Sequence, residues 1–254
     1  MQRSPSPRLF IDAPLHVAAE PFELPREAAH HLSAVLRARE GSLVTLFNGL
    51  GGEYEARLTE VRRRSVRCEV IAFHALERRS PLAVHLVQAL ARGTRMDLVM
   101  QKATELGAAS IQPLAAARSN VKLDAERADD RLAHWTRITI AACEQCGRND
   151  LPKVRPVTDL ASLLSMGGQT DAKVWRLFAD PDASLRISDL LTTRATRPSA
   201  IWLVIGPEGG LCAEEIEALA AANARGLSLG PRVLRTETAG LAALAALQAQ
   251  FGDL

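Results

Sequence analysis

The sequence has few aromatic residues, few cysteines and no long apolar run. Aromatics make up 4% of the 254 residues, and the four cysteines are too few for the disulfide framework of a secreted domain. No apolar segment approaches the roughly 20 residues that span a bilayer, and the opening MQRSPSPRLF contains no apolar signal core. These features predict a cytoplasmic protein without a membrane partner.

Familiar catalytic and nucleotide-binding motifs are also missing. There is no GxxxxGK[ST] and no GxGxxG in a first β-α-β unit, which argues against a P-loop or an ordinary Rossmann site. There is no GxSxG, HExxH or paired-carboxylate pattern, so hydrolysis is unsupported. A single CxxC, Cys143 to Cys146, is expected at the C-terminal end of a helix and has no second ligand pair. We therefore predict no bound metal and keep a zinc or redox protein only as a minor alternative.

Lysine is scarce, because only four of the 31 basic residues are lysine. Arginine binds phosphate bidentately and stacks on bases. Residues 1–80 hold 12 arginines against 10 acidic residues, and this excess accounts for the whole net charge of +2. A predicted hairpin carries an arginine group that could follow a nucleic-acid backbone. The group comprises Arg57, Arg62, Arg63, Arg64 and Arg67. A solvated turn explains these arginines equally well.

Pattern changes divide the chain near a charged linker, Glu77 to Pro81. Before it, alternating apolar residues predict a helix followed by a small β-barrel or meander. Its elements are expected at Pro25–Arg37, Leu43–Phe47, Glu53–Glu60 and Ser65–Phe73. After it, strands alternate with helices, which predicts a parallel sheet with helices on both faces. The strands are expected at Ala83–Ala89, Ser110–Leu114 and Val174–Phe178. The helices are expected at Arg95–Leu106 and Asp124–Cys143, with a further short helix that begins at Asp159.

The stretch from Leu203 to Ala239 holds two loops that each follow a predicted strand. The strand Ile201–Ile205 precedes GPEGG, and the strand Leu227–Leu229 precedes Gly230-Pro231. Thr236 is expected to cap a helix from Glu237 to about Gln250. Glycines permit close approach of a ligand, and we expect Glu208 and Glu237 to lie beside Arg232 and Arg235. One such turn is usually only a tight connection, but two side by side predict a ligand site.

IGPEGG and LGPRVLRTETA, at Ile205–Gly210 and Leu229–Ala239, resemble the ribosomal RNA small subunit methyltransferase E family of the trefoil-knotted SPOUT class. The likeness covers almost the whole chain and extends to His30–Arg37, Arg95–Asp97, Lys102–Gly107, Arg118-Ser119 and Ala141–Arg148. It implies an α/β fold with a PUA-like β-barrel RNA-binding domain at residues 1–76. A SPOUT methyltransferase domain, with a mostly parallel sheet and a trefoil knot, is implied at residues 77–254. The knot follows from the resemblance alone, because threaded chains are rare.

The resemblance further implies S-adenosylmethionine-dependent methylation of the N3 imide nitrogen of a uridine in 16S rRNA. The assembled small ribosomal subunit is the expected form of the substrate, and free rRNA stays open as the alternative. Arg232 and Arg235 are the candidates for stabilising the base anion, and Glu208 or Glu237 for accepting the proton or orienting the arginines. Cofactor contacts are expected at Ala179, Gly206, Pro207, Glu208, Gly209, Gly210, Leu229, Gly230, Leu234, Arg235 and Thr236. RNA contacts are expected at Arg8, Arg37, Arg62, Arg63, Arg64, Arg92, Arg95, Arg118 and Arg148.

Two points stay open on the sequence. A non-catalytic RNA-binding or ribosome-assembly protein would explain the basic N-terminal segment but not the two glycine loops, and binding of S-adenosylmethionine discriminates between these functions. The C-terminal helix is rich in alanine, with Leu241, Leu244 and Leu247 at every third position. Such a helix could be buried in its own domain or join a homodimer; the resemblance favours the homodimer.

Overall fold

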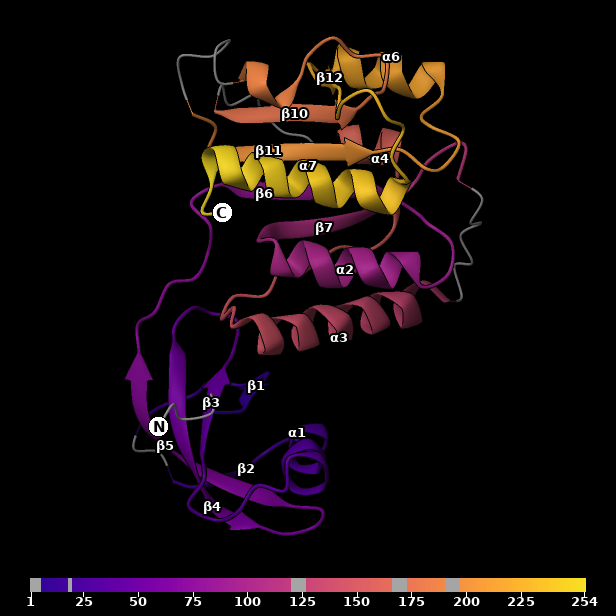
Figure 1. Cartoon of the computed structure of the whole chain (residues 1–254). Coiled ribbons are helices and arrows are strands. Elements are labelled where there is room, and N and C mark those ends of the chain that lie inside the picture. The colour runs from indigo at the N-terminus through magenta and orange to yellow at the C-terminus, as the bar shows by residue number, and fades with distance from the viewer. Residues whose placement is uncertain (1–5, 18–19, 120–126, 166–172, 191–196) are drawn as a thin grey trace. The chain divides into compact units, whose positions relative to one another are not determined.

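The computed structural model describes residues 6–17, 20–119, 127–165, 173–190 and 197–254 (Figure 1). The chain forms two compact units. The first comprises Met1–Arg79 with Cys143–Leu151, and the second comprises Ser80–Ala142 with Pro152–Leu254. The excursion of Cys143–Leu151 into the first unit was not predicted, because no local pattern marks it.

The first unit is built on a five-stranded sheet with the order β1-β3-β4-β5-β2, in which only the β1–β3 pair is parallel. Alternation in β5 places Val66, Cys68 and Val70 in the core beside Leu32, as expected for strands with one buried face. The elements are β1 (Arg8–Phe10), β2 (Phe22–Glu23), α1 (Arg26–His30), the π-helix η1 (His31–Val35), β3 (Leu43–Phe47), β4 (Glu53–Val61) and β5 (Val66–His74).

One helix prediction in this unit needs correction. The single helix expected over Pro25–Arg37 is a short α-helix, α1, that continues as the π-helical turn η1. It ends before Arg37, whose φ of 52° lies in the left-handed region and cannot continue a right-handed helix.

The second unit contains a seven-stranded sheet of order β12-β10-β11-β6-β7-β8, and β9 also pairs with β7. Every pair is parallel, which confirms the predicted sheet type. Its strands are β6 (Ala83–Ala89), β7 (Ala108–Ala115), β8 (Lys153–Val154), β9 (Thr158–Asp159), β10 (Val174–Ala179), β11 (Ala200–Ile205) and β12 (Arg225–Leu227). Its helices are α2 (Arg95–Glu105), α3 (Ala128–Cys146, whose last turn belongs to the first unit), α4 (Leu160–Ser165), the 3-10 turn η3 (Ile187–Asp189), α6 (Ala213–Ala221) and α7 (Thr236–Phe251).

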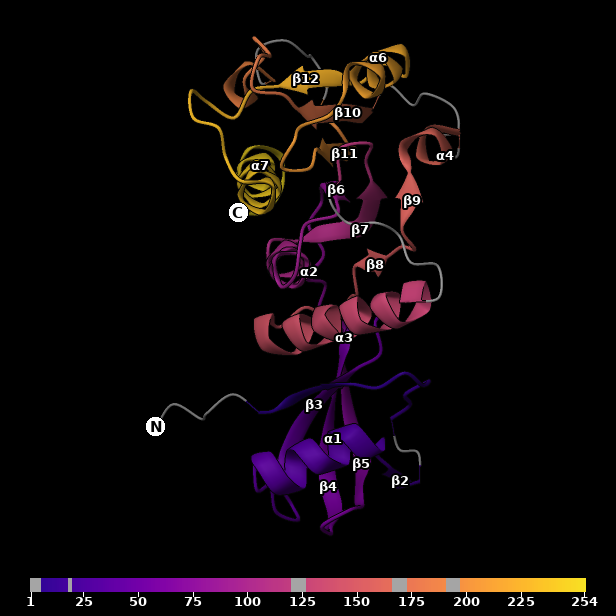
Figure 2. The ribbon, with the colours of Figure 1, turned by 90° about the vertical axis from the view of Figure 1, so that its right-hand side faces the viewer.

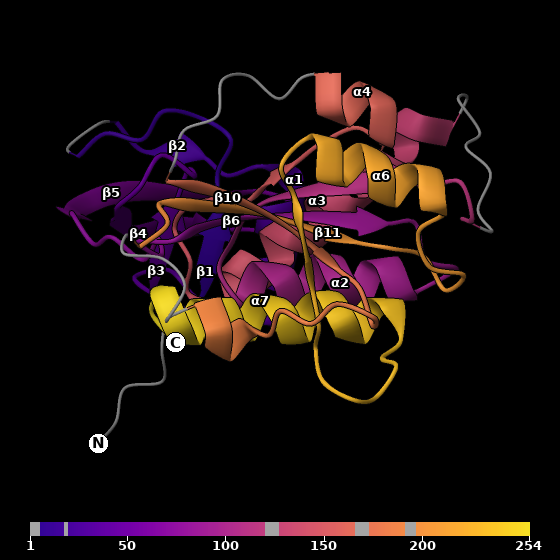
Figure 3. The same cartoon turned by 90° about the horizontal axis from the view of Figure 1, so that it is seen from above.

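Helices cover both faces of this sheet, as predicted. Helices α2 and α7 lie on one face, and α4 and α6 lie on the other (Figures 2 and 3). Alternate residues of β6 supply both cores: Leu86 packs with α2 and α7, while Val87 packs with α4 and α6. A strand buried on both faces reads as a continuous apolar run, which is why the pattern predicted these strands well.

Three predicted boundaries differ from the structure. Strand β12 ends at Leu227 rather than Leu229. Helix α7 already includes Thr236, with Arg235 at the N-cap position, so Thr236 is not its cap. Helix α3 ends at Cys146, three residues later than expected, and its predicted start at Asp124 lies outside the described residues. The trefoil knot stays a prediction. None of the described helices is both long and apolar enough to cross a membrane.

Candidate functional site

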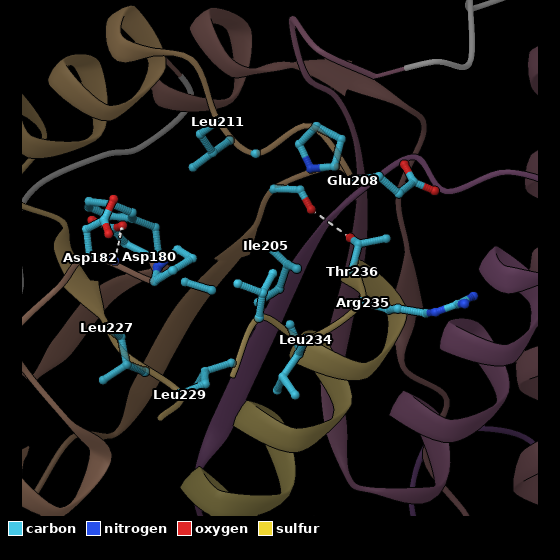
Figure 4. A pocket seen from close by; sticks show the side chains of 18 of the residues that line it. Asp180, Asp182, Ile205, Glu208, Leu211, Leu227, Leu229, Leu234, Arg235 and Thr236 are labelled. Carbon is cyan, nitrogen blue, oxygen red and sulfur yellow. Dashed lines mark hydrogen bonds between the residues drawn. The ribbon is translucent and has the colours of Figure 1, made fainter. Parts of the chain in front are cut away.

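The carboxyl ends of β10, β11 and β12 meet at one edge of the sheet, where a cavity of about 500 Å³ opens (Figure 4). Parallel sheets characteristically bind ligands outside the carboxyl ends of their strands. The segments that follow these three strands line the cavity, together with the first turn of α7. The two predicted glycine loops therefore do lie side by side.

Glycine is required in both loops by backbone conformation. Gly210 has a φ of 70° and Gly230 a φ of 102°, which side-chain-bearing residues rarely adopt. An added Cβ at either position would meet nothing within 4 Å. Crowding therefore does not select glycine at these two positions; the left-handed turns do.

The interior of the cavity is mainly apolar. Ile205, Leu227, Leu229 and Leu234 line it from three different segments (Figure 4). In the described part of the chain, no hydrogen bond is donated by the amides of Leu229, Val233 and Leu234. Apolar walls with a few free backbone donors suit a flat heterocycle that needs both burial and edge recognition.

Two carboxylates form one end of the cavity and were not predicted. Asp180 and Asp182 follow β10, and the Asp182 amide donates to Oδ1 of Asp180 at 3.0 Å, which holds the turn (Figure 4). Of this segment, only Ala179 was predicted to contact the cofactor. The strand-end rule that identified the glycine loops applies equally to Asp180-Pro181-Asp182 and could have found it.

A buried polar network fixes the floor of the site. The Thr236 hydroxyl donates to the Gly206 carbonyl at 2.6 Å and accepts from Nε2 of Gln88 at 2.8 Å. An added Cβ at Gly240 would lie 2.6 Å from Oε1 of Gln88, so glycine on α7 makes room for this side chain. The network joins the start of α7 to β6 and to the loop after β11, and it explains why Thr236 is buried instead of capping.

Glu208 at the rim and the buried Glu237 pair with an arginine that was not predicted to contact them. Nη1 of Arg95 lies 2.9 Å from Oε1 of Glu208, and Nε of Arg95 lies 3.6 Å from Oε1 of Glu237. Arg232 and Arg235 are exposed and form no ion pair with described residues. Figure 4 shows Arg235 directed away from the apolar residues. The expectation that Glu208 and Glu237 lie beside Arg232 and Arg235 is therefore corrected: Arg95 at the start of α2 links the two carboxylates.

Comparison with known proteins bears on these residues. Residues 78–248 match the RNA methyltransferase domain family, and residues 24–71 match the RNA methyltransferase PUA domain. Ribosomal RNA small subunit methyltransferase E of Bacillus subtilis is 36% identical over 234 residues, which cover 91% of each chain. The chain belongs to the ribosomal RNA small subunit methyltransferase E family.

Two solved structures extend the likeness to a bound cofactor. Ribosomal RNA small subunit methyltransferase E from Neisseria gonorrhoeae, bound to S-adenosylmethionine, is 35% identical, with a TM-score of 0.88 over 98% of this chain and 99% of that one. A structure from Legionella pneumophila with bound S-adenosylmethionine is 38% identical, with a TM-score of 0.90 over 99% of this chain and all of that one. The α/β fold, with a parallel sheet and a curled PUA-like N-terminal sheet, is the fold of this family.

Most residues that the family resemblance assigned to the cofactor line the cavity: Ala179, Gly206, Pro207, Glu208, Gly210, Leu229, Gly230, Leu234, Arg235 and Thr236. Gly209 does not; its carbonyl accepts from Nη1 of Arg118 at 3.2 Å, and the same nitrogen reaches the Leu211 carbonyl at 3.4 Å. Arg118 therefore anchors the GPEGG loop from outside. Of the predicted catalytic residues, Arg232, Arg235 and Glu208 lie at the cavity and Glu237 is buried behind it.

The arginines that the family resemblance assigned to RNA fall into two groups. Arg8 and Arg148 lie inside the first unit: Arg148 is 7% exposed and pairs with Asp150 at 2.8 Å, and Arg8 pairs with Glu53 and donates to the Arg148 carbonyl. These partners give both arginines a structural role and leave them little surface for phosphate. The others, Arg95 apart, are exposed: Arg37, Arg62, Arg63, Arg64, Arg92 and Arg118.

The CxxC motif lies where it was expected, in the last turn of α3. Burial raises the pKa of the Cys143 thiol to about 12, and its Sγ lies 3.6 Å from the Asp150 carbonyl. Cys146 is exposed. A thiol held protonated in this way does not suit thiolate or disulfide exchange chemistry. Among the described residues, no group of three His, Cys, Asp or Glu could hold a metal.

Proposed function

We propose that this chain transfers a methyl group from S-adenosylmethionine to N3 of a uridine in 16S rRNA. The observation that carries the proposal is the cavity formed by the two glycine loops at the carboxyl ends of β10, β11 and β12. Its support from relatives is a bound S-adenosylmethionine in two structures that align over nearly the whole chain. The choice of rRNA as the substrate is supported by relatives that are named ribosomal RNA small subunit methyltransferase E.

The residues present fit this cofactor. A volume of about 500 Å³ is within the usual range for a small-molecule site. Leu227, Leu229 and Leu234 would hold the adenine ring, and the free amides of Leu229, Val233 and Leu234 would meet its polar edge. Asp180 and Asp182 would accept from the ribose hydroxyls or the ammonium group. The bound cofactor supplies an activated methyl group whose displacement needs positioning more than covalent help.

The uridine makes a separate demand on the chain, because its imide nitrogen carries a proton at neutral pH. Arg232 and Arg235 are exposed at the rim and free of ion pairs with described residues, so their charges can stabilise the developing base anion. Glu208, at the rim, is the better candidate to accept the proton, since Glu237 is 8% exposed and does not line the cavity. Arg95 would orient Glu208 through their 2.9 Å ion pair.

The test is calorimetric titration of the full chain with S-adenosylmethionine, for which we expect one site per chain. Leu229→Asp places a charge against the adenine position and should abolish detectable binding. Leu50→Asp is the matched control, because Leu50 is 84% exposed and does not line the cavity. Thermal unfolding of both variants separates lost binding from lost folding. A wild-type chain that binds RNA but no S-adenosylmethionine would support the alternative of a non-catalytic RNA-binding protein.

Three further expectations belong with this proposal. The assembled small subunit is expected to be the substrate, the protein is expected in the cytoplasm, and two chains are expected to form a homodimer partly through α7. The side of α7 that is buried within the chain is not available for a contact between two chains. Ala243, Leu244 and Leu247 are fully buried in the chain's own core, whereas Ala242 is exposed. A contact between chains through α7 would therefore use the exposed side that includes Ala242.

A further inference from the structure

A row of aromatic and polar side chains crosses the sheet of the second unit. The pairing register places one residue of each of five neighbouring strands, β10, β11, β6, β7 and β8, side by side, and residues paired in register on parallel strands project from the same face. A sixth residue lies two positions further along the chain than the β8 member, and so on the same side of that segment. We call these six residues the basic-aromatic strip: Arg176, Trp202, His85, Ser110, Lys153 and Arg155.

The strip lies on the face of the sheet that α4 and α6 cover only in part. These helices pack over Val87, Val204 and Phe178, toward the carboxyl ends of the strands, and Trp202 packs against the edge of this core. The strip crosses the amino-terminal halves of the same strands. It is therefore at the opposite end of the strands from the cofactor cavity, and methyl transfer at that cavity gives it no role.

An aromatic pair occupies the middle of the strip. The rings of His85 and Trp202 have centroids 4.8 Å apart and planes inclined by 31°. Nδ1 of His85 lies 2.8 Å from the Ser110 hydroxyl, which fixes the imidazole. Burial, with a smaller contribution from the charge of Arg155, lowers the pKa of His85 below 6.5, so the imidazole is uncharged at neutral pH. Both rings are half-buried. At this separation and inclination they pack face against face, so a further flat ring could stack only on the outer face of Trp202.

The cations that flank this aromatic pair have no carboxylate partner among the described residues. Arg155, Arg176 and Lys153 form no ion pair there, and Nε of Arg155 is buried without a hydrogen-bond partner. Four strand intervals make the strip about 19 Å long, a length over which a nucleic-acid strand carries several phosphates. Unpaired cations beside an accessible indole match a ligand that brings both negative charge and flat rings.

We propose that the basic-aromatic strip binds a single-stranded segment of RNA, with a base stacked on Trp202 and phosphates held by Arg155, Arg176 and Lys153. Stacking on aromatic residues and salt-dependent phosphate contacts are the two ingredients of sequence-tolerant single-strand binding. The strip would hold RNA at a distance from the target uridine, so the site goes beyond the proposed methyl transfer and does not depend on it.

Tryptophan fluorescence gives a direct test, because Trp135 and Trp175 are 6% and 3% exposed and Trp202 is the accessible tryptophan. A single-stranded uridine oligonucleotide should quench the emission of the full chain, and Trp202→Phe should remove most of that quenching. Trp202→Ala should weaken oligonucleotide binding about 5- to 150-fold, the range for loss of one stacked base. Unchanged quenching in Trp202→Phe would overturn the stacking.

The phosphate contacts need a charge-matched comparison. Arg155→Gln with Arg176→Gln should weaken binding and reduce the slope of log affinity against log salt by about 1.4, since each phosphate contact to a single strand contributes about 0.7. The control, Arg131→Gln with Arg137→Gln, removes the same charge from α3 and should leave the slope unchanged. Both doubles should bind S-adenosylmethionine like the wild type. An equal effect of the two doubles, or no effect of the first, would overturn the proposal, while lost cofactor binding would count against the cavity assignment instead.

Discussion

The buried link between Thr236, Gln88 and the Gly206 carbonyl gives a sharp stability prediction. Thr236→Val keeps the shape of the side chain and removes its hydroxyl. The Gly206 carbonyl then loses the 2.6 Å hydrogen bond, and Nε2 of Gln88 loses the 2.8 Å bond and keeps only a 3.3 Å contact with the Ala89 carbonyl. A buried polar group left without its partner costs about 1–3 kcal/mol. We therefore expect a loss of about 2–4 kcal/mol in the free energy of unfolding.

For a chain of this length such a loss lowers the melting temperature by roughly 5 to 15 °C, which thermal unfolding measures. Thr236→Ser keeps the hydroxyl and should cost only about 1 kcal/mol, the value of one buried methyl group. Gln88→Met removes the side-chain amide that Thr236→Val leaves without its partner. The double variant should therefore lose at least about 1 kcal/mol less free energy of unfolding than the two single variants lose in sum. Strict additivity, or a harmless Thr236→Val, would refute the network as the anchor of the loop.

Four other outcomes are expected. Cys212 is the N-cap residue of α6 but a weak acceptor, so Cys212→Ser should keep activity and add a few tenths to about 1 kcal/mol in chemical denaturation; impaired cofactor binding in a folded variant would reveal a role for the thiol. Replacing Arg62, Arg63 and Arg64 together by glutamine should weaken rRNA binding and flatten its salt dependence without altering cofactor affinity. An unchanged slope of log affinity against log salt would favour a solvated turn. Burial raises the pKa of Glu144 above 4.5 despite the Phe10 amide bond, so its stabilising contribution is full below about pH 4.5 and is lost as the pH rises through the folded pKa. Glu144→Gln should therefore gain stability over wild type between pH 4 and pH 7, and a constant difference would contradict this. Ala242→Glu should reduce both the dimer mass seen by light scattering and cofactor binding. A wild-type protein that is monomeric yet fully active would contradict the proposed homodimer.

Local patterns were enough to predict the sheet and both glycine loops. Strand β11 is apolar throughout and β6 is apolar except at His85 and Gln88, so their limits follow from the apolar run and the turn residues after it. The pairing of Arg95 with Glu208 could not be found in this way, because 113 residues separate them. The same holds for the burial of Thr236, whose local sequence is that of a helix cap while its actual partners come from β6 and from the loop after β11. The position of Asp180 was predictable from the strand-end rule and was missed.

The knot, the dimer and the roles of single residues entered through the family resemblance, since no periodicity encodes them. Arg95, and not Arg232 or Arg235, is the ion-pair partner of Glu208 and Glu237, and this changes how the site is expected to work. Arg95 becomes a residue that positions Glu208, and the two unpaired arginines remain available to the base.

The measurement that tests the central claim most directly is nucleoside mass spectrometry of 16S rRNA. Small subunits from cells that lack this methylation would be incubated with the protein and S-adenosylmethionine, and their rRNA digested and compared with an untreated sample. We predict one uridine per rRNA heavier by a single methyl group on N3, formed by the wild type and by Leu50→Asp but not by Leu229→Asp. A chain that binds the cofactor yet leaves every uridine unchanged, or that methylates a ribose or another base, would contradict the assignment.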